Sequence, residues 1–210
     1  YVKINSNTST VGDESLQIKR NNTNCIVAVN NNRNKGVKKM LLDHPDIHVI
    51  LLDDGFQHRW INPGLNIITT PFHKPFTKDK LFPLGRLREN IGQAKRANII
   101  LVTKTPKDVQ KAQKDNITKE LNLKAHQKGY FASITYHKYK CINHNTELDN
   151  TSDYNSITLV TGIADPLPLI NHLNKKGRKV NLIKFADHYN YTAKDIDNIL
   201  LAHQKNKNSK

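Results

Sequence analysis

The chain is poor in cysteine and in aromatic residues, and it contains no long apolar run. Its two cysteines, Cys25 and Cys141, lie far apart in the 210-residue sequence and give neither a disulfide framework nor metal-ligand spacing. This cysteine usage predicts a reducing, cytosolic setting. No apolar run approaches the roughly 20 residues that cross a bilayer, and no signal peptide is visible. With 37% hydrophobic residues, the chain can still build one sizeable core or two small ones.

Acidic residues are also scarce relative to basic ones. Asp and Glu number 18 against 33 Lys and Arg, so the formal net charge is +15. Such a surface attracts phosphate, carried by nucleic acid, by anionic lipid or by a phosphorylated substrate, and the charge alone does not choose among them. A basic nucleic-acid-binding module is therefore an alternative function. Aromatic residues make up only 7% of the chain, which is little for stacking bases, so we expect no nucleic-acid partner.

Apolar runs alternate with polar, helix-like segments along the chain. The pattern predicts strands at 25–29, 49–52, 65–69, 99–102, 157–160 and 180–185, and helices at 35–44, 107–123 and 167–176. Strands interleaved with helices indicate an α/β fold with a parallel sheet. Residues 130–140 alternate more like an exposed or two-stranded element, and residues 143–156 look like a polar connection.

The most informative stretch is residues 48–59, His-Val-Ile-Leu-Leu-Asp-Asp-Gly-Phe-Gln-His-Arg. An apolar run that suits a buried parallel strand stops at Asp53 and Asp54, and a glycine then turns the chain and presents Gln57 and His58. Open α/β sheets bind ligands at the carboxyl ends of their strands. Acidic residues at such an end hold Mg²⁺ in nucleotide-phosphate enzymes. The alternative is a strand that is followed by an ordinary polar turn.

Two further clusters carry groups that suit proton transfer. Asp13 follows Gly12 in a polar loop and could serve as a general base or a metal ligand, or simply as an acidic residue in the first turn of a helix. Asp187 and His188 place an imidazole next to a carboxylate, which is useful near neutral pH. Alternatively, Asp187 and Thr192 are cap-type residues around a helix that begins near Ala193, and His188 is incidental.

Arginines form the remaining candidate phosphate contacts. Arg86 and Arg88 follow a turn that contains Pro83 and Gly85 and precede Glu89, and Arg33 follows the predicted strand at 25–29. Guanidinium groups bind phosphate oxygens bidentately, and a neighbouring carboxylate can orient them or reach a metal. A turn with ordinary surface arginines is the competing interpretation.

Taken together and in order, these clusters resemble the tetraacyldisaccharide 4′-kinases, the lipid A 4′-kinase family of Gram-negative bacteria. The resemblance covers nearly the whole chain. It is carried by Gly12-Asp13-Glu14, Arg33, Asp53-Asp54-Gly55-Phe56-Gln57-His58, Leu84-Gly85-Arg86-Leu87-Arg88-Glu89, Val102-Thr103-Lys104, Thr161-Gly162-Ile163-Ala164 and Asp187-His188.

The resemblance implies a substrate, cofactors and a location. Such enzymes transfer the γ-phosphoryl group of ATP, with Mg²⁺, to the 4′-hydroxyl of a tetraacylated glucosamine disaccharide 1-phosphate. They work as peripheral proteins at the cytoplasmic face of the inner membrane. Their fold is a P-loop NTPase-like core with a parallel sheet, joined by a short β linker to a second, smaller α/β domain. For this chain that implies core residues 1–135, a linker at 136–156 and a partial second domain at 157–210.

The resemblance also assigns roles to individual residues. Asp13, paired with His188, would accept the proton of the attacking sugar hydroxyl. Arg33 and Arg88 would neutralise phosphate charge. The remaining assignments are Asp53 and Asp54, with Glu89, as ligands of Mg²⁺ directly or through water, and Gln57 and His58 as residues that line the substrate site.

The sequence also departs from the family pattern. No G-x-x-x-x-G-K-[ST] phosphate loop occurs, so no nucleotide-binding residue is assigned, and Ser15 stands where a proline commonly follows Gly-Asp-Glu. At the other end the chain finishes in a Lys- and Asn-rich tail. We therefore expect a form truncated at both ends, with little or no kinase activity alone. A degenerate homologue without catalysis is the alternative to truncation.

Overall fold

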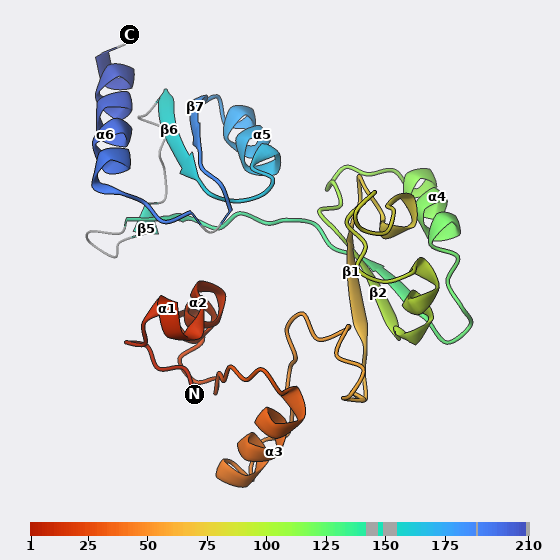
Figure 1. Cartoon of the computed structure of the whole chain (residues 1–210). Coiled ribbons are helices and arrows are strands. Elements are labelled where there is room, and N and C mark those ends of the chain that lie inside the picture. The colour runs from red at the N-terminus through yellow and green to blue at the C-terminus, as the bar shows by residue number, and fades with distance from the viewer. Residues whose placement is uncertain (142–146, 149–154, 188, 209–210) are drawn as a thin grey trace. The chain divides into compact units, whose positions relative to one another are not determined.

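The chain folds into two compact units of mixed α/β structure, residues 1–135 and residues 136–210 (Figure 1). The computed structural model describes residues 1–141, 147–148, 155–187 and 189–208. Each unit contains parallel strands that are accompanied by helices. The α/β class that the alternation of strands and helices predicts is therefore confirmed.

The first unit is built on a three-stranded parallel sheet. Its strands β1 (Ile67–Pro71), β2 (Ile99–Thr103) and β3 (Lys128–Phe131) lie in the order β1-β2-β3. β2 is the central strand, and its Ile100 and Val102 are almost completely buried. β-Branched residues dominate β1 and β2, as expected for strands that pack on a pleated surface.

Helix α4 (Lys111–Leu121) covers one face of this sheet. Its Ile117 and Leu121 join Ile100, Val102 and Ala97 in the hydrophobic core. The spacing of Ile117 and Leu121 places both side chains on one face of the helix. Asn122 ends the helix in the left-handed conformation.

The other helices of the first unit are short. They are α1 (Thr8–Val11), α2 (Asp13–Asn21), α3 (Arg33–Asp43) and the 3₁₀ helices η1 (Phe76–Lys78) and η2 (Ile91–Arg96). Asparagine side chains cap three of them, because a short amide oxygen can accept a hydrogen bond from an unpaired N–H of the first turn. These caps are Asn7 of α1, Asn32 of α3 and Asn90 of η2.

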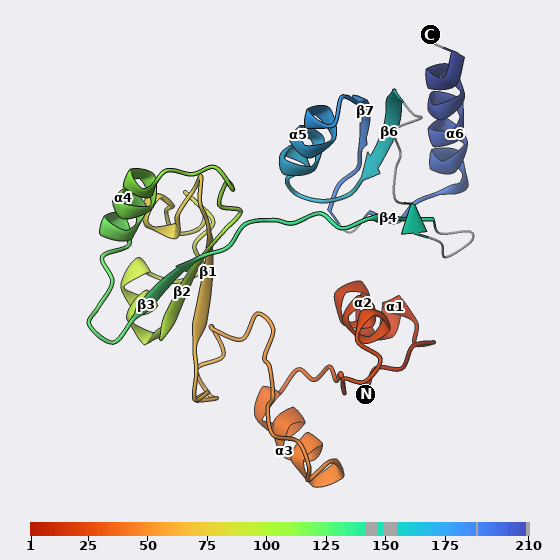
Figure 2. The same ribbon diagram turned by 180° about the vertical axis from the view of Figure 1, so that it is seen from behind.

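The second unit combines a parallel pair of strands with two helices. β6 (Ser156–Thr161) and β7 (Lys179–Lys184) pair in parallel, and α5 (Leu167–Lys175) connects them. α6 (Ala193–Asn208) lies beside β6 and α5 beside β7 (Figure 2). β4 (Tyr139–Lys140) and β5 (Glu147–Leu148) form a small antiparallel pair. The polar connection expected at 143–156 lies largely outside the described residues.

Four predicted strands and three predicted helices are confirmed, with ends that shift by at most four residues. The strands predicted at 25–29 and 49–52, both within the described residues, are wrong. The second of these runs forms no regular element, and its Val49 and Leu51 are 74% and 89% exposed. A buried strand needs neighbours that complete its hydrogen bonds and cover its side chains, and the described part of the chain supplies none for this run. In the segment 130–140, residues 130–131 belong to β3 of the parallel sheet, whereas Tyr139 and Lys140 form β4 of a two-stranded pair, as the alternation allowed.

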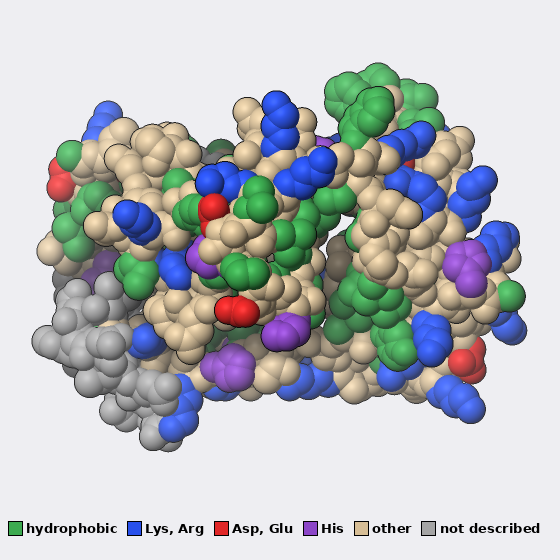
Figure 3. Space-filling model, turned by 90° about the horizontal axis from the view of Figure 1, so that it is seen from below, with side chains coloured by type: hydrophobic (Ala, Val, Ile, Leu, Met, Phe, Trp, Pro, Cys, Tyr) green, Lys and Arg blue, Asp and Glu red, His purple; other side chains and the backbone are tan. Residues whose placement is uncertain are grey.

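The molecular surface is strongly basic. On the face drawn in Figure 3, Lys and Arg side chains far outnumber Asp and Glu side chains. Within the described ranges, no helix has the length and apolar character needed to cross a membrane.

Candidate functional site

A cavity of about 580 Å³ in the first unit brings together residues from distant parts of the sequence. Residues 50–57 form one wall, and residues 65–69, which lead into β1, form another. A third wall is formed by residues 87–90 and by residues 91, 93 and 94 of η2. Five of the nine predicted site residues line this cavity. They are Asp53, Asp54, Gln57, Arg88 and Glu89.

The acidic loop at 53–59 is a tight turn. Asp53 accepts a hydrogen bond at Oδ1 from the backbone N–H of Asp54 over 3.0 Å, and Asp54 has a positive φ of 47°. Aspartate is one of the few residues that tolerate this conformation. Gly55 is required by the close approach of the chain, because a Cβ atom there would lie 2.9 Å from Cβ of Leu52. The turn therefore leaves both carboxylates exposed at the cavity.

The segment that carries Arg88 and Glu89 is held by a second tight turn. Asp79 accepts hydrogen bonds at Oδ1 from the backbone N–H groups of Lys80 and Arg86, and its Oδ2 lies 3.3 Å from Nε of Arg86. The N–H of Lys80, above all, holds the pKa of the Asp79 carboxyl below its ordinary value, with help from Arg86 and Lys74. Nothing in the sequence pattern singled out Asp79.

Arg88 joins the two segments. Its Nη1 lies 3.3 Å from Oδ2 of Asp54 and 3.2 Å from Oε1 of Gln57. The side chains of Arg88 and Asp54 are 68% and 77% exposed, so this ion pair is screened by water and weak. Both groups can therefore exchange this contact for a phosphate or a cation at small cost.

Glu89 contacts two arginines. Its Oε2 lies 2.7 Å from Nη2 of Arg96, and its Oε1 lies 3.5 Å from Nε of Arg59. Among the described residues, no three His, Cys, Asp or Glu side chains stand close enough together to hold a metal ion. Asp53, Asp54 and Glu89 thus do not form a three-carboxylate cluster, and Glu89 instead pairs with two arginines.

The two neighbouring aspartates nevertheless fit Mg²⁺ on chemical grounds. Mg²⁺ prefers oxygen ligands and is usually held by one or two carboxylates, with the remaining positions taken by water and substrate phosphates. Asp53 and Asp54 are exposed, and both line the cavity. Arg88 next to them supplies the charge that a phosphate group requires.

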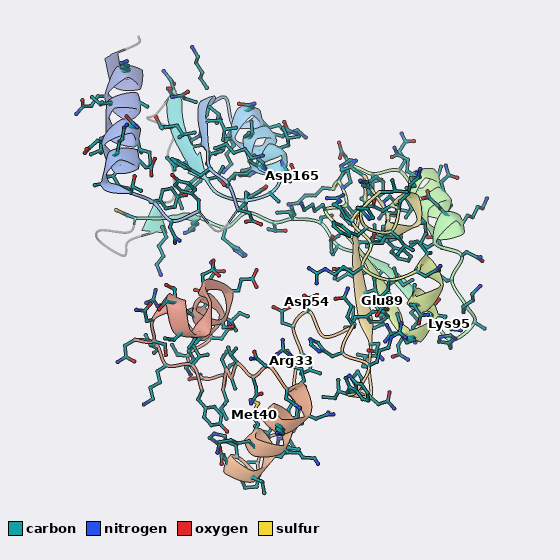
Figure 4. The ribbon with its side chains drawn as sticks, viewed as in Figure 1. Arg33, Met40, Asp54, Glu89, Lys95 and Asp165 are labelled. Carbon is teal, nitrogen blue, oxygen red and sulfur yellow. The ribbon has the colours of Figure 1, made fainter. Side chains whose placement is uncertain are left out.

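Arg33 lies outside the residues that line the cavity, at the first turn of α3. Its Nη1 donates a hydrogen bond to the carbonyl of Asn30. The next residue, Asn34, donates from Nδ2 to the carbonyl of Trp60 over 2.8 Å. This bond ties the start of α3 to the residue that follows the acidic loop. Arg33 and Asp54, one from each of these two segments, are labelled in Figure 4. His58 is half-buried within that loop and is not part of the cavity wall.

The expected proton-accepting pair is only partly within the described residues. Asp13 is exposed and is the first residue of α2, where Gly12 precedes it with a φ of 81°. His188 lies outside the described residues, so its pairing with Asp13 remains a prediction. The helix that the alternative interpretation expected near Ala193 is α6, and Thr192 and Asp195 exchange hydrogen bonds at its start.

Two arginines at the site were not anticipated as site residues. Arg59 ends the stretch 48–59, but neither its pattern nor the family resemblance assigns this residue a role. Arg96 lies in a segment without any recognisable pattern. Both contact Glu89. Arg96 follows Glu89 by seven residues, or two turns of an ideal helix, but no sequence rule says that such a spacing is functional.

Comparison with known proteins identifies the family. The model of the family described as tetraacyldisaccharide-1-P 4′-kinase matches residues 1–209. Proteins named tetraacyldisaccharide 4′-kinase from Bacteroides thetaiotaomicron and Bacteroides fragilis are 37% and 38% identical, each over 92% of this chain and 54% of the relative. The one from Cytophaga hutchinsonii is 37% identical over 93% of this chain and 55% of its own length.

The chain spans about half the length of the curated relatives it matches. No solved structure matches it significantly. The ordered motifs, the family match over residues 1–209 and the identity to these relatives agree with one another. The chain belongs to the tetraacyldisaccharide-1-P 4′-kinase family.

Proposed function

We propose that this chain carries the metal- and phosphate-binding part of a kinase in lipid A biosynthesis. The reaction is transfer of the γ-phosphoryl group of ATP to the 4′-hydroxyl of a tetraacyldisaccharide 1-phosphate. The observation that carries the proposal is the cavity in which Asp53, Asp54 and Gln57 meet Arg88 and Glu89, two segments separated by some thirty residues. Family membership supplies the substrate class, since the relatives are named for this disaccharide.

The proposed roles follow from the chemistry of phosphoryl transfer, in which positioning and charge stabilisation supply most of the rate. Arg88, and Arg33 beside the end of the acidic loop, bring positive charge to the phosphate oxygens. Asp53 and Asp54, with Glu89, would hold Mg²⁺ directly or through water. Bound Mg²⁺ supplies neutralisation of phosphate charge. Gln57 lines the cavity next to these carboxylates, and His58, which follows it in the acidic loop, is the other residue assigned to the substrate.

Proton removal from the sugar hydroxyl is assigned to Asp13, with His188 as its partner. A carboxylate next to an imidazole is a suitable acceptor near neutral pH. Both residues stand in the ordered set of motifs that carries the resemblance to the family.

The wider organisation is part of the same proposal. Residues 1–135 correspond to a P-loop NTPase-like core, residues 136–156 to a β linker and residues 157–210 to a second, smaller α/β domain. The basic surface suits a phosphorylated substrate in an anionic membrane, with which the protein makes peripheral contact at the cytoplasmic face of the inner membrane.

The test is direct phosphorylation of tetraacyldisaccharide 1-phosphate by the product of the complete reading frame, with ATP and Mg²⁺. Asp13→Ala should lower kcat roughly 10²- to 10⁴-fold and change KM far less, because a general base acts in the transition state. An effect on KM alone would make Asp13 a binding residue. Absence of any phosphorylation by the unaltered protein would favour a degenerate homologue instead.

A further inference from the structure

Arg96 contacts both halves of the candidate site, although it does not line the cavity. Its Nη1 donates a hydrogen bond to the carbonyl of Phe56, in the acidic loop, over 3.0 Å. Its Nη2 lies 2.7 Å from Oε2 of Glu89. The centre of the same guanidinium group stands 4.2 Å from the centroid of the Phe56 ring. One side chain therefore touches the acidic loop twice and Glu89 once.

These three contacts require the shape of arginine. A planar guanidinium group can lie over an aromatic ring and donate in two directions within its own plane, whereas a lysine ammonium is a point charge on a flexible stem. Arg96 is 30% exposed at its side chain, so its contacts are less screened than the open pair of Arg88 and Asp54.

The backbone that carries Arg96 is anchored to the sheet. Arg96 ends η2, and the next residue, Ala97, is completely buried in the core. The side chain of Gln127 donates from Nε2 to the carbonyls of Ala94 and Ala97 over 2.8 and 2.9 Å. The N–H of Asn98 donates to the carbonyl of Asn66 just before β1. The backbone that carries Arg96 is therefore held to the sheet.

The acidic loop has no strand hydrogen bonds that would hold it to the sheet. Residues 53–59 belong to no strand, and Asp53, Asp54 and Gln57 are exposed. Phe56 is the residue of this loop that packs against the core, and it is also the one that Arg96 contacts by ring and by carbonyl. Arg96 thus links the loop to the sheet.

We propose that Arg96 is a positioning residue, which fixes the acidic loop and Glu89 so that the carboxylates face a bound divalent cation and phosphate. The choice of a divalent cation and phosphate as the ligands rests on the function proposed above. Arg96 acts through Phe56 and Glu89 and does not itself contact substrate. The expected consequence of its loss is a loosened loop on an intact sheet.

Amide hydrogen exchange in the 210-residue chain tests this consequence without any ligand. The reporters are the N–H groups of His58 and Ile61, which donate to the carbonyls of Gly55 and His58. Arg96→Ala and Arg96→Lys should each speed their exchange about tenfold, while amides of β2 keep their protection. The matched control is Lys95→Ala, because Lys95 is the adjacent exposed cation, which should leave both regions unchanged (Figure 4).

The outcomes separate the inference from the proposed function. Exchange at His58 and Ile61 that stays as in the unaltered chain overturns the positioning role. An equal loss of protection in β2 also overturns it, since Arg96 would then only stabilise the fold.

In parallel, Mn²⁺ binding is followed by electron paramagnetic resonance, with Asp53→Asn/Asp54→Asn as the negative control.

If the unaltered chain binds Mn²⁺ through these aspartates, Arg96→Lys should weaken that binding roughly tenfold, as for residues that orient metal ligands. Unchanged Mn²⁺ affinity in Arg96→Lys would overturn the inference and leave the function standing. If Mn²⁺ binding does not depend on Asp53 and Asp54, the metal assignment of the proposed function fails, and hydrogen exchange still decides the role of Arg96.

Discussion

At the scale of single residues, Gly85 shows how one missing side chain shapes the site. A Cβ atom at this position would lie 2.2 Å from the carbonyl oxygen of Lys80 and 2.6 Å from Oδ1 of Asp79. Both are parts of the turn itself, so the neighbours cannot move aside without opening it. Gly85 thereby permits the close packing that presents Arg88 and Glu89.

Gly85→Ala should therefore destabilise the first unit by about 1–3 kcal/mol, the usual cost of forcing atoms into a packed site. Urea unfolding gives the change in free energy. Gly64→Ala is the matched control, because a Cβ atom there meets nothing within 4 Å, and it should be neutral or stabilising by up to about 1 kcal/mol. Equal stability of the two variants would show that the turn can relax.

Some residues of the site can be predicted from the sequence, and others, such as Arg96, cannot. Asp53, Asp54, Gln57, Arg88 and Glu89 were predicted because they belong to short strings with recognisable chemistry, and they line one cavity. Arg96 and Asp79 were not, because their importance comes from which backbone atoms they reach in three dimensions. Side chains that hold functional loops carry no signature in a single sequence.

At the scale of elements, the turn between Asp79 and Leu87 behaves as one hydrogen-bonded unit. The N–H of Leu87 donates to the carbonyl of Lys80 over 3.0 Å, and the N–H of Phe82 donates to the carbonyl of Leu87 over 2.9 Å. Asp79 accepts bonds from both ends of the unit, at Lys80 and at Arg86. Its ionised form is therefore the one that the folded turn favours.

The stability of this turn should depend on pH in a defined direction. Because the folded-state pKa of Asp79 is lowered, chiefly by the N–H of Lys80, its contribution is present above the unfolded pKa of about 3.9. The contribution is lost as the pH falls through the folded-state pKa. Asp79→Asn should thus destabilise the chain near pH 7, and the difference from the unaltered chain should shrink below about pH 4.

Urea unfolding of both proteins across this pH range measures the difference. Asp46→Asn provides the control, since Asp46 is an exposed carboxylate outside the turn. A difference between Asp79→Asn and the unaltered chain that stays constant down to the acid end would mean that the charge of Asp79 does not matter to the turn.

Whether an apolar run forms a strand depends on whether neighbouring strands are present to pair with it. The apolar run at 99–102 became β2 because β1 and β3 flank it and α4 covers it. The run at 49–52 is also wholly aliphatic, yet it pairs with no strand of the described chain, and Leu51 is 89% exposed. Composition predicts what a segment can become, whereas hydrogen-bonding partners decide whether it does.

At the scale of the whole molecule, the net charge of +15 raises the question of which phosphate-bearing partner the surface attracts. Basic residues are spread over the chain, and the face in Figure 3 shows them dispersed among other side chains. A dispersed positive charge favours contact with an extended anionic surface, with little dependence on sequence or shape. An anionic bilayer is such a surface.

We expect the chain to co-sediment with vesicles that contain anionic phospholipid and not with purely zwitterionic vesicles. Because the contact is electrostatic, binding should fall steeply as the ionic strength rises from about 0.1 M to 1 M, where the Debye length shrinks from about 10 Å to 3 Å. Single-stranded DNA, offered at equal phosphate concentration, should compete poorly, since few aromatic residues are present to stack its bases. Tighter binding to DNA than to the vesicles would reverse this assignment and favour a nucleic-acid-binding module, whereas equal binding to zwitterionic vesicles would show that charge does not drive the contact.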